Sequence, residues 1–270
     1  MLKVEHVVTY GWEAAIRGMR NPMNSWEKSD TVFYDDENFW SIHTTEDYPC
    51  VDLGIGPNDD QLMKSLQKGG PVHAKFRRMI NITMDITAPL YWWKEFDTYK
   101  VGTVANSCST MHKIQAKEFT EDDFSCEHLI RGVSDESGHD DWYHDSLDQT
   151  YWTSYDILEQ TILVLNFYRQ KFLETNDKNY WWQMIQLLPS SYNQKRTVQL
   201  NYEVAAHIYP DRKDHKLDEW HVLCDEFDGL PYSWLITEKI PKEDPVIDFK
   251  LKEIKKQIVD LEQQIQSKKI

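Results

Sequence analysis

The middle of the chain carries the strongest helical pattern. Between residues 147 and 174, apolar side chains recur every three or four positions, as on one face of an α-helix: Leu147, Tyr151, Tyr155, Leu158, Ile162, Leu165 and Phe172. We therefore expect one long helix over 147–174. Residues 179–188 predict a second helix that stops before Pro189, because a proline disfavours helical backbone in the residue that precedes it. Residues 200–209 and 214–228 are further helix candidates.

The first third of the chain combines helix and strand patterns. Residues 77–87 alternate polar and apolar side chains, which predicts a β-strand with one buried face. Residues 11–25 predict a helix that ends near Asn21-Pro22, and residues 57–68 predict a short helix that opens with acidic capping residues. The segment 89–100 begins with a proline, which is favoured in the first turn of a helix. A sheet early in the chain and helices late indicate an α+β protein.

Two segments differ from this pattern. Residues 118–146 are rich in Asp, Glu, Gly and Ser, which is typical of a solvated insertion outside the core. Near the C-terminus, apolar residues follow the alternating steps of three and four that are typical of a coiled coil: Leu251, Ile254, Ile258, Leu261 and Ile265. Two heptads are too short to be stable alone, so this helix should pack on its own domain or on a second subunit. We predict one domain over 1–245 and a helical tail over 246–270.

Composition excludes several classes of protein. The chain has 270 residues, 40% of them hydrophobic, with 11 Trp, which is enough to bury a core. The net charge of −15 repels phosphate backbones, so we expect no nucleic-acid partner, and an anionic ligand must be held by a local cluster of basic groups. The longest apolar run, around Thr161–Leu165, is far shorter than the about 20 residues of a membrane span.

Cysteine usage and the N-terminus indicate the compartment. The chain has four cysteines, Cys50, Cys108, Cys126 and Cys224. They form no CxxC pair, and the first residues, MLKVEH, lack the apolar stretch of a signal peptide. We therefore expect reduced thiols and a cytoplasmic protein.

Two polar clusters contain residue types that bind metals. His139, Asp140, Asp141 and His144 lie in GHDDWYHD, with Cys126 and His128 upstream; Asp211, His215, Asp218 and Glu219 lie within nine positions. Neither spacing matches a metal-binding signature, so we favour a polar loop and a solvated helix face, and predict no metal. The chain also lacks the GxGxxG, GxxxxGK[ST], HExxH and GxSxG motifs of common enzyme classes.

One series of residues matches the motif spacing of a known enzyme family. Pro89 is followed by the aromatic-rich segment LYWWKEFD, then by Thr98-Tyr99-Lys100 and by Asn106-Ser-Cys-Ser-Thr-Met-His112. Here the sequence resembles the flavin-dependent thymidylate synthases, in which a proline and an aromatic-rich helix precede Arg-His-Arg and then Asn-Glu-x-Ser-x-Arg-Tyr. One inserted residue is needed to align the two patterns.

The resemblance extends to both sides of this central motif and covers about residues 11–225. The N-terminal AAIRGMRNPMNS is similar to the family's Ala-Arg-x-Ser helix end, and the family's histidine after a glycine turn falls at His73. After the motif, the family has Leu-Pro, an Asn twelve residues past the proline, a His or Asn, and an Arg. Pro189, Asn201, His207 and Arg212 match that order and spacing.

The resemblance implies a fold, a reaction and a site. The implied fold is α+β, with a central mixed or antiparallel sheet, flanking helices, and flavin sites formed between the subunits of a homotetramer. The implied reaction transfers a one-carbon unit from methylenetetrahydrofolate to C5 of dUMP with reduced FAD, which NADPH regenerates. The residues carried over as flavin contacts are His73, Thr98, Tyr99, Lys100, Asn201 and His207.

Two further residues are carried over to the nucleotide. Ser109 would face it, and Arg212 would lie against the uracil. A guanidinium is permanently charged, so Arg212 would stabilise the negative charge that develops on a pyrimidine carbonyl.

Several family positions hold other residues here. Thr98-Tyr99-Lys100 keeps one cation of two, and Glu, Arg, Tyr and a second Arg are replaced by Ser107, Met111, His112 and Ile185. The replacements remove two phosphate partners of dUMP. They leave open a re-purposed or non-catalytic relative that binds another pyrimidine nucleotide or a protein partner, and an enzyme with another pyrimidine substrate or one-carbon product.

Each matched residue also has a structural interpretation. Asn201 could cap the following helix, which Pro210 should end, and Arg212 could pair with neighbouring aspartates. His73 and His207 could be structural histidines, and the adjacent Trp92 and Trp93 belong more naturally to a core than to a flavin stack.

Overall fold

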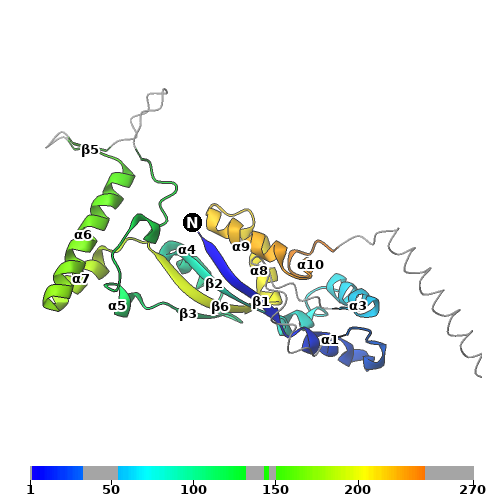
Figure 1. Ribbon diagram of the computed structural model, residues 1–270. Helices are drawn as coiled ribbons and strands as arrows, with labels where there is room; N and C mark the ends of the chain where they lie inside the picture. The colour runs from blue at the N-terminus through cyan, green and yellow to red at the C-terminus, as the bar shows by residue number, and fades with distance from the viewer. Residues whose placement is uncertain (1, 33–53, 132–142, 146–149, 241–270) are drawn as a thin grey trace, which may run out of the picture. The chain divides into compact units, whose positions relative to one another are not determined.

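The structure, a computed structural model, describes residues 2–32, 54–131, 143–145 and 150–240 (Figure 1). The strands are β1 (Lys3–Tyr10), β2 (Asn81–Pro89), β3 (Val104–Ser107), β4 (Tyr143–Asp145), β5 (Thr150–Trp152) and β6 (Asn193–Asn201). The α-helices are α1 (Trp12–Arg20), α3 (Pro57–Lys68), α4 (Leu90–Phe96), α5 (Thr110–Lys113), α6 (Ser154–Thr175), α7 (Lys178–Leu187), α8 (Tyr202–Arg212), α9 (Asp218–Gly229) and α10 (Trp234–Thr237). The 3₁₀ turns are η1 (Asn21–Met23), η2 (Trp26–Lys28), η3 (Lys75–Met79) and η4 (Glu121–Asp123).

One compact unit extends to Thr237. The predicted domain boundary at 245 and the heptad tail lie outside the described residues and stay predictions. Among the helices that the structure describes, none is both long and apolar enough to cross a bilayer.

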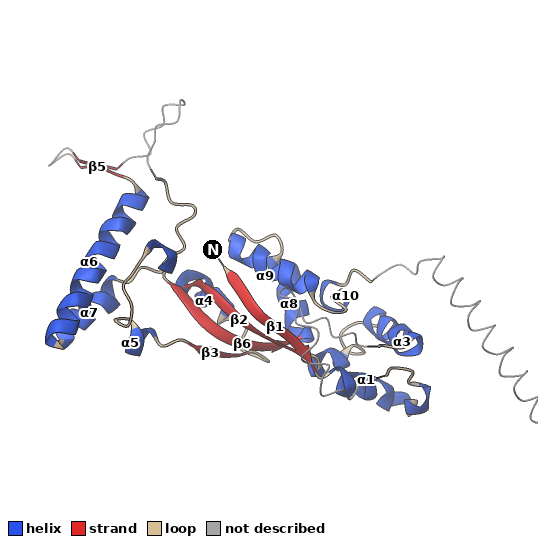
Figure 2. Cartoon of the chain, viewed as in Figure 1, coloured by secondary structure: helices blue, strands red, loops and turns tan. Residues whose placement is uncertain are grey.

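The centre of the fold is an antiparallel sheet of four strands in the order β1-β2-β6-β3 (Figure 2). Strands β2 and β6 pair along their whole length, from Asn81 opposite Asn201 to Pro89 opposite Asn193. Together with the flanking helices, this sheet confirms the α+β class.

The buried face of the sheet follows the predicted alternation. Ile82, Met84 and Ile86 are fully buried, whereas the residues between them stay partly exposed. The strand begins at Asn81 instead of the predicted 77. Residues 75–79 form the turn η3 because Arg77 turns inward and pairs with Glu203 at 2.7 Å.

Aromatic side chains fill the core between this face and the helices. Trp92 and Trp93 of α4 are 0% and 1% exposed, which confirms the prediction that they belong to the core. Trp92 stacks on Phe96 with ring centres 5.1 Å apart and contacts Trp220 of α9 at 4.8 Å.

The helices α6 and α7 pack on a second, smaller apolar cluster. Its buried members come partly from the segment before α6: Ile114, Phe119, Phe124, Cys126, Leu158, Leu165 and Met184. The prediction that 118–146 lies outside the core is therefore wrong for its first part, because Phe119, Phe124 and Cys126 are buried in this cluster despite the acidic residues around them. Helix α6 also begins later than predicted, at Ser154, because Thr153 and Asp156 form a capping box.

Two local predictions in the last third are corrected. Pro210 does not end its helix, since α8 continues to Arg212. The exposed Pro210 lies in the last turn, where its missing N–H leaves only one helical carbonyl without a donor. No strand is predicted over 193–201, although β6 lies inside the sheet. Its pattern is weak because only Val198 and Leu200 are both apolar and buried.

Candidate functional site

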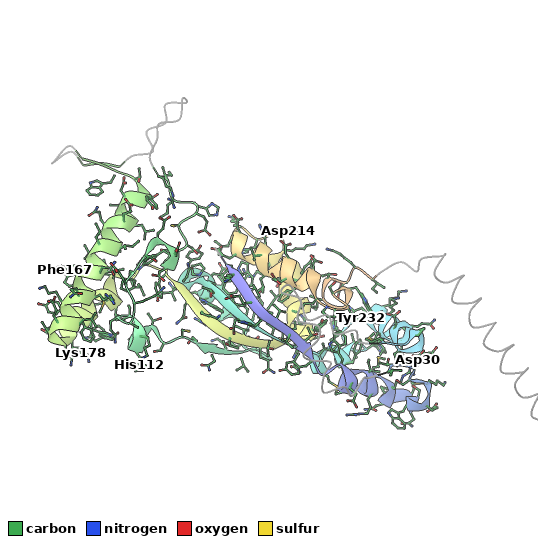
Figure 3. The ribbon with its side chains drawn as sticks, viewed as in Figure 1. Asp30, His112, Phe167, Lys178, Asp214 and Tyr232 are labelled. Carbon is green, nitrogen blue, oxygen red and sulfur yellow. The ribbon has the colours of Figure 1, made fainter. Side chains whose placement is uncertain are left out.

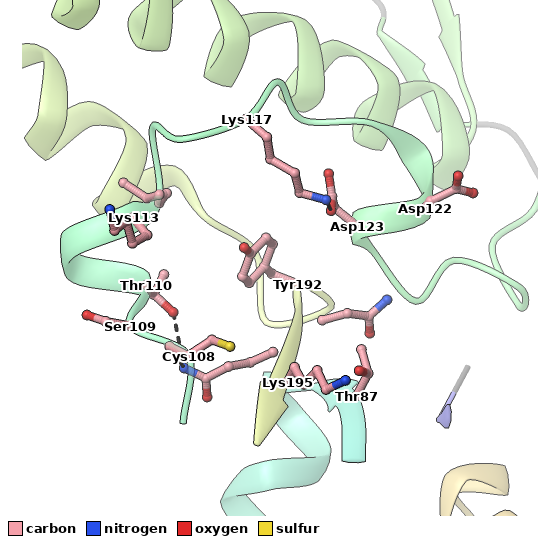
Figure 4. Close-up of a pocket in the computed structure, with 13 residues that line it drawn as sticks. Thr87, Cys108, Ser109, Thr110, Lys113, Lys117, Asp122, Asp123, Tyr192 and Lys195 are labelled. Atoms are coloured by element: carbon pink, nitrogen blue, oxygen red, sulfur yellow. Dashed lines mark hydrogen bonds and ion pairs between the residues drawn. The ribbon is translucent and has the colours of Figure 1, made fainter. Parts of the chain in front are cut away.

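A cavity of about 340 Å³ opens where the beginning of β6 meets α5 and η4 (Figure 4). Such a volume lies at the small end of the roughly 300–1,000 Å³ typical of ligand pockets, so it suits a mononucleotide better than a dinucleotide. Its polar residues come from four elements: Thr87 from β2, Lys195 from β6, Ser109 from the cap of α5, and Asp122 and Asp123 from η4.

Strand pairing places Ser109 at this cavity. Strand β3 runs antiparallel to β6, and the Cys108 N–H extends the pairing by donating to the Lys195 carbonyl at 2.9 Å. The Gln194 side-chain amide then donates to the Cys108 carbonyl at 2.9 Å and to the Thr110 hydroxyl at 3.2 Å. The Ser109 hydroxyl oxygen accepts from the His112 N–H at 3.2 Å, which leaves the hydroxyl proton free to donate into the cavity.

Lysines surround the cavity in an otherwise acidic protein. Lys117 pairs with Asp123, and Lys195 lies 3.2 Å from Asp85 and 3.4 Å from Glu5. The hydrogen bond to Asp123 raises the pKa of Lys117, and the hydrogen bond to Asp85 raises the pKa of Lys195, so both ammonium groups stay charged at neutral pH.

Tyr192 stands in the middle of the cavity wall (Figure 4). Burial raises the pKa of its phenol, and the nearby Asp123 carboxylate adds to that rise. The neutral hydroxyl can donate a hydrogen bond to an anion, and the ring offers an apolar surface to a ligand.

The residues that the resemblance assigns to the flavin lie around α8, at the other end of β6. Asn201 ends β6 and caps α8, since its Oδ1 accepts from the Val204 N–H at 3.0 Å. The turn that follows Lys100 packs on this cap: Gly102 has a φ of +78°, and a Cβ there would lie 2.9 Å from Val204. Gly102 thereby allows the predicted flavin segment 98–100 to approach Asn201.

Arg212, at the end of α8, is held by an aromatic and acidic cluster. Its Nη1 donates to Glu95 at 2.6 Å and its Nε donates to the Tyr99 hydroxyl at 2.8 Å. The guanidinium lies 4.4 Å from the centre of the Trp220 ring. The predicted pairing with neighbouring aspartates is therefore replaced by a pair with Glu95, and Nη2 has no described partner.

The two histidines are exposed and lie near α8. His207 projects from α8 with 68% of its side chain exposed, 3.5 Å from Glu203. His73 is exposed and precedes η3, which Arg77 ties to the same Glu203. No described contact joins the His73 ring to Arg212, and neither residue lines the cavity of Ser109.

The two predicted halves of the site lie far apart in one protomer. Gln194, at the cavity, and Asn201, at the cap of α8, are separated by seven residue steps along β6. At about 3.3 Å per residue the separation is roughly 23 Å. The cavity and the cap of α8 therefore lie at opposite ends of β6, and Arg212 does not line the cavity.

Solved structures with this topology bind a flavin and a uracil nucleotide. Flavin-dependent thymidylate synthase ThyX from Helicobacter pylori, complexed with FAD and dUMP, is 15% identical, and the match covers 88% of this chain and 100% of that chain with a TM-score of 0.55. A second structure of that synthase with FAD and dUMP is 16% identical over 87% and 96% of the two chains, with a TM-score of 0.53. This chain has the fold of the flavin-dependent thymidylate synthases.

A further neighbour acts on the same class of nucleotide. The UMP/dUMP methylase PolB from Streptomyces cacaoi, bound with 5-Br dUMP, is 12% identical, with 85% and 89% of the two chains covered and a TM-score of 0.50. No protein-family model matches the sequence, and no curated protein matches it. The likeness to the thymidylate synthase fold is thus carried by the backbone, and the implied fold is confirmed.

The sequence did not single out three residues that give the cavity its cations and its neutral phenol. These residues lie outside the family motifs that the sequence matches: Lys117, Tyr192 and Lys195. No local pattern marked them, because Lys117 lies in the turn that follows α5, whereas Tyr192 and Lys195 belong to the segment around the start of β6.

The metal candidates receive no support in the described part of the chain, where no group of three or more ligand-type side chains gathers. His139, Asp140 and Asp141 lie outside the described residues. The favoured solvated face at 211–219 is wrong for Glu219, which is buried and accepts a hydrogen bond from Tyr91.

Replacing the cap residue separates its two candidate roles. Asn201→Ala should lower the free energy of unfolding by about 1 kcal/mol, because the Val204 N–H loses its acceptor. Asn201→Ser should retain most of this stability, since serine also caps helices. If Asn201 also binds the flavin, the serine variant should bind FAD more weakly although it melts like the wild type. Urea unfolding and FAD titration measure the two effects, and equal FAD affinity in Asn201→Ser would leave the residue with capping alone.

Proposed function

We propose that this protein is a flavin-dependent enzyme that transfers a one-carbon unit from methylenetetrahydrofolate to C5 of dUMP, with FAD as cofactor and NADPH as reductant. The proposal is carried by one observation: Ser109, the residue assigned to the nucleotide, lines a lysine-bearing cavity of mononucleotide size in a thymidylate synthase fold. The solved neighbours bind FAD and dUMP, which supports the same ligands here.

The side chains around α8 fit a flavin dinucleotide. Four of the residues assigned to the flavin are exposed: His73, Thr98, Lys100 and His207. The side-chain amide of Asn201 caps α8 through its oxygen and also has an NH₂ group that can donate. This set offers a cation, imidazoles, a hydroxyl and an amide, which suit a pyrophosphate and the carbonyls of a flavin ring. When bound, reduced flavin would supply the hydride. The chain's own residues would orient the two partners and exclude water.

Arg212 would act on the uracil as an electrostatic group. Glu95 and Tyr99 fix two of its nitrogens, and the Trp220 ring supports the plane of the guanidinium. Its Nη2 is left to donate to a carbonyl oxygen on which negative charge develops. The Glu95 carboxylate thus positions the cation without consuming all its donors.

The site needs two copies of the chain. In one protomer Arg212 does not line the cavity of Ser109, so we propose that a nucleotide that touches both lies between protomers. Exposed apolar residues on α6, among them Leu163 and Phe167, provide a surface of the kind that subunit contacts cover (Figure 3). We expect a homo-oligomer, and the resemblance favours a tetramer.

Thiol labelling tests where the nucleotide binds. Cys108 is exposed and lines the cavity, whereas Cys126 and Cys224 are buried. Saturating dUMP should slow alkylation of Cys108 about tenfold or more, because a ligand held in the cavity covers the thiol for about nine-tenths of the time at ten times its dissociation constant. Peptide mass spectrometry measures the modified fraction, with Cys126 as the internal control. Unchanged labelling of Cys108 at dUMP concentrations that saturate binding would place the nucleotide elsewhere.

Turnover decides between catalysis and a re-purposed fold. Release of tritium from C5-labelled dUMP, in the presence of methylenetetrahydrofolate, FAD and NADPH, is the expected result. The replacements at Met111 and Ile185 favour the alternative, a relative that binds another pyrimidine nucleotide or a protein partner. dUMP binding without tritium release, with flavin bound, would support that alternative, and release from another uracil nucleotide would redefine the substrate.

A further inference from the structure

The cavity beside Ser109 has an excess of cations although the protein is strongly acidic. Three lysines line it, Lys113, Lys117 and Lys195, against the two aspartates of η4, in a chain with net charge −15. The nearest acids are already engaged: Asp123 pairs with Lys117 and accepts from the Thr120 N–H in a capping box. Lys195 is in turn paired with Asp85 and Glu5, which lie outside the lining, so among the lining residues the lysines outnumber the acids by one.

Two of these lysines reach the cavity from opposite walls. In Figure 4, Lys117 descends from the segment before η4, Lys195 extends from β6, and Tyr192 stands between them. An ammonium group has three N–H donors. Lys117 uses one described donor on Asp123, and Lys195 has contacts with Asp85 and Glu5, so each retains capacity for a further acceptor. Lys113, at the rim, has no described ionic partner.

Two neutral hydrogen-bond donors line the cavity together with the lysines. The Ser109 hydroxyl has a free proton, and the Tyr192 phenol is neutral. A phosphate monoester carries close to two negative charges at neutral pH and offers three oxygens, which suits a cavity lined by lysines and hydroxyls from different elements. A single carboxylate has fewer acceptors, and a dinucleotide is too large for about 340 Å³.

We propose that Lys117 and Lys195, with Lys113 at the rim, bind the phosphate of a nucleoside 5′-monophosphate. This assignment rests on the proposed function, because the nucleotide of that reaction is the ligand. These lysines, all supplied by one chain, would replace the arginines that the resemblance expects at Met111 and Ile185. The pocket would therefore require the phosphate and reject the free nucleoside.

Calorimetric titration of the full-length protein with dUMP, deoxyuridine and inorganic phosphate tests the assignment. Lys117→Gln and Lys195→Gln should each raise the Kd for dUMP about tenfold to a hundredfold, since each removes a charge-assisted hydrogen bond. Lys68→Gln, at an exposed lysine near the end of α3, is the matched control and should leave the Kd unchanged. Deoxyuridine should bind much more weakly than dUMP, and added salt should weaken dUMP binding.

The outcomes separate this assignment from the proposed function. Binding of dCMP and dAMP with the same dependence on Lys117 and Lys195 would support the phosphate site and count against a uracil-specific enzyme. Tight dUMP binding that neither folded lysine variant weakens would overturn the phosphate site and spare the proposed function. Equal affinity for dUMP and deoxyuridine, or no affinity for any monophosphate, would also overturn it. Circular dichroism confirms that each variant is folded.

Discussion

Two inactive variants of this protein, mixed so that their subunits exchange, are expected to regain about a quarter of the wild-type turnover. One variant combines Ser109→Ala with Lys195→Gln and damages the cavity; the other is Arg212→Ala. If a site takes the cavity from one protomer and Arg212 from another, random mixing pairs two intact halves in one of four cases. The expectation follows from the proposal that Arg212, which does not line the cavity of its own chain, reaches the nucleotide from a second protomer.

Each variant alone should lose most activity. Removing a group that stabilises developing charge costs roughly a hundredfold to a thousandfold in rate, so Arg212→Ala should be nearly inactive. Tritium release measures turnover, and native mass spectrometry shows that subunits have exchanged. Each variant mixed with itself serves as the control. Mixed oligomers that stay as inactive as their parents would mean that Ser109 and Arg212 act within one chain.

Loss of the Asp59 charge should destabilise the fold by about 3–5 kcal/mol. Asp59 is fully buried and lies 2.6 Å from Arg20 of α1, which is 4% exposed. Its other oxygen accepts from the hydroxyls of Ser29 and Thr31. Asp59→Asn leaves the Arg20 cation buried without its counter-ion. Urea unfolding measures the change, and Asp60→Asn, which breaks a partly exposed pair with Lys64 one helical turn away, should cost about 1 kcal/mol or less.

The cost of Asp59→Asn should depend on pH. Burial alone would raise the pKa of Asp59, but the hydroxyls of Thr31 and Ser29 and the Arg20 guanidinium outweigh it and lower the pKa below its usual range. A lowered folded pKa means that the stabilisation is complete above the unfolded pKa of about 3.9 and is lost as the pH falls through the folded value. The difference between wild type and variant should therefore be constant from pH 7 to pH 5 and shrink below pH 4. A difference that grows on acidification would contradict the assignment of the charge to Asp59.

The sequence predicts those elements whose pattern reflects burial on one side. The alternation at 77–87 predicted the strand β2, and the spacing of apolar residues predicted α6, which begins seven residues later than expected. The helix candidates 179–188 and 214–228 match α7 and α9 to within four residues at each end. Strand β6 escaped prediction because it contacts the core through only two buried apolar side chains and offers its other residues to the cavity and the solvent. Its position between β2 and β3 depends on long-range pairing, which no local pattern encodes.

The site was predictable only in part, and for a similar reason. The motif spacing predicted roles for Ser109 and for the segments around α8; the structure places Ser109 at the cavity, and the roles themselves stay predictions. The lysines of the cavity come from separate elements, and only the pairing of β3 with β6 brings Ser109 to Lys195. The pairing of Arg212 with Glu95 likewise joins residues that are far apart along the chain.

A crystal structure of the protein with dUMP would show directly whether the cavity beside Ser109 binds a pyrimidine nucleotide. We expect the nucleotide in this cavity, with its phosphate within hydrogen-bonding distance of Lys117 or Lys195 and its uracil facing Arg212 of a neighbouring protomer. A nucleotide that binds at another surface, with the cavity filled by solvent, would contradict this expectation.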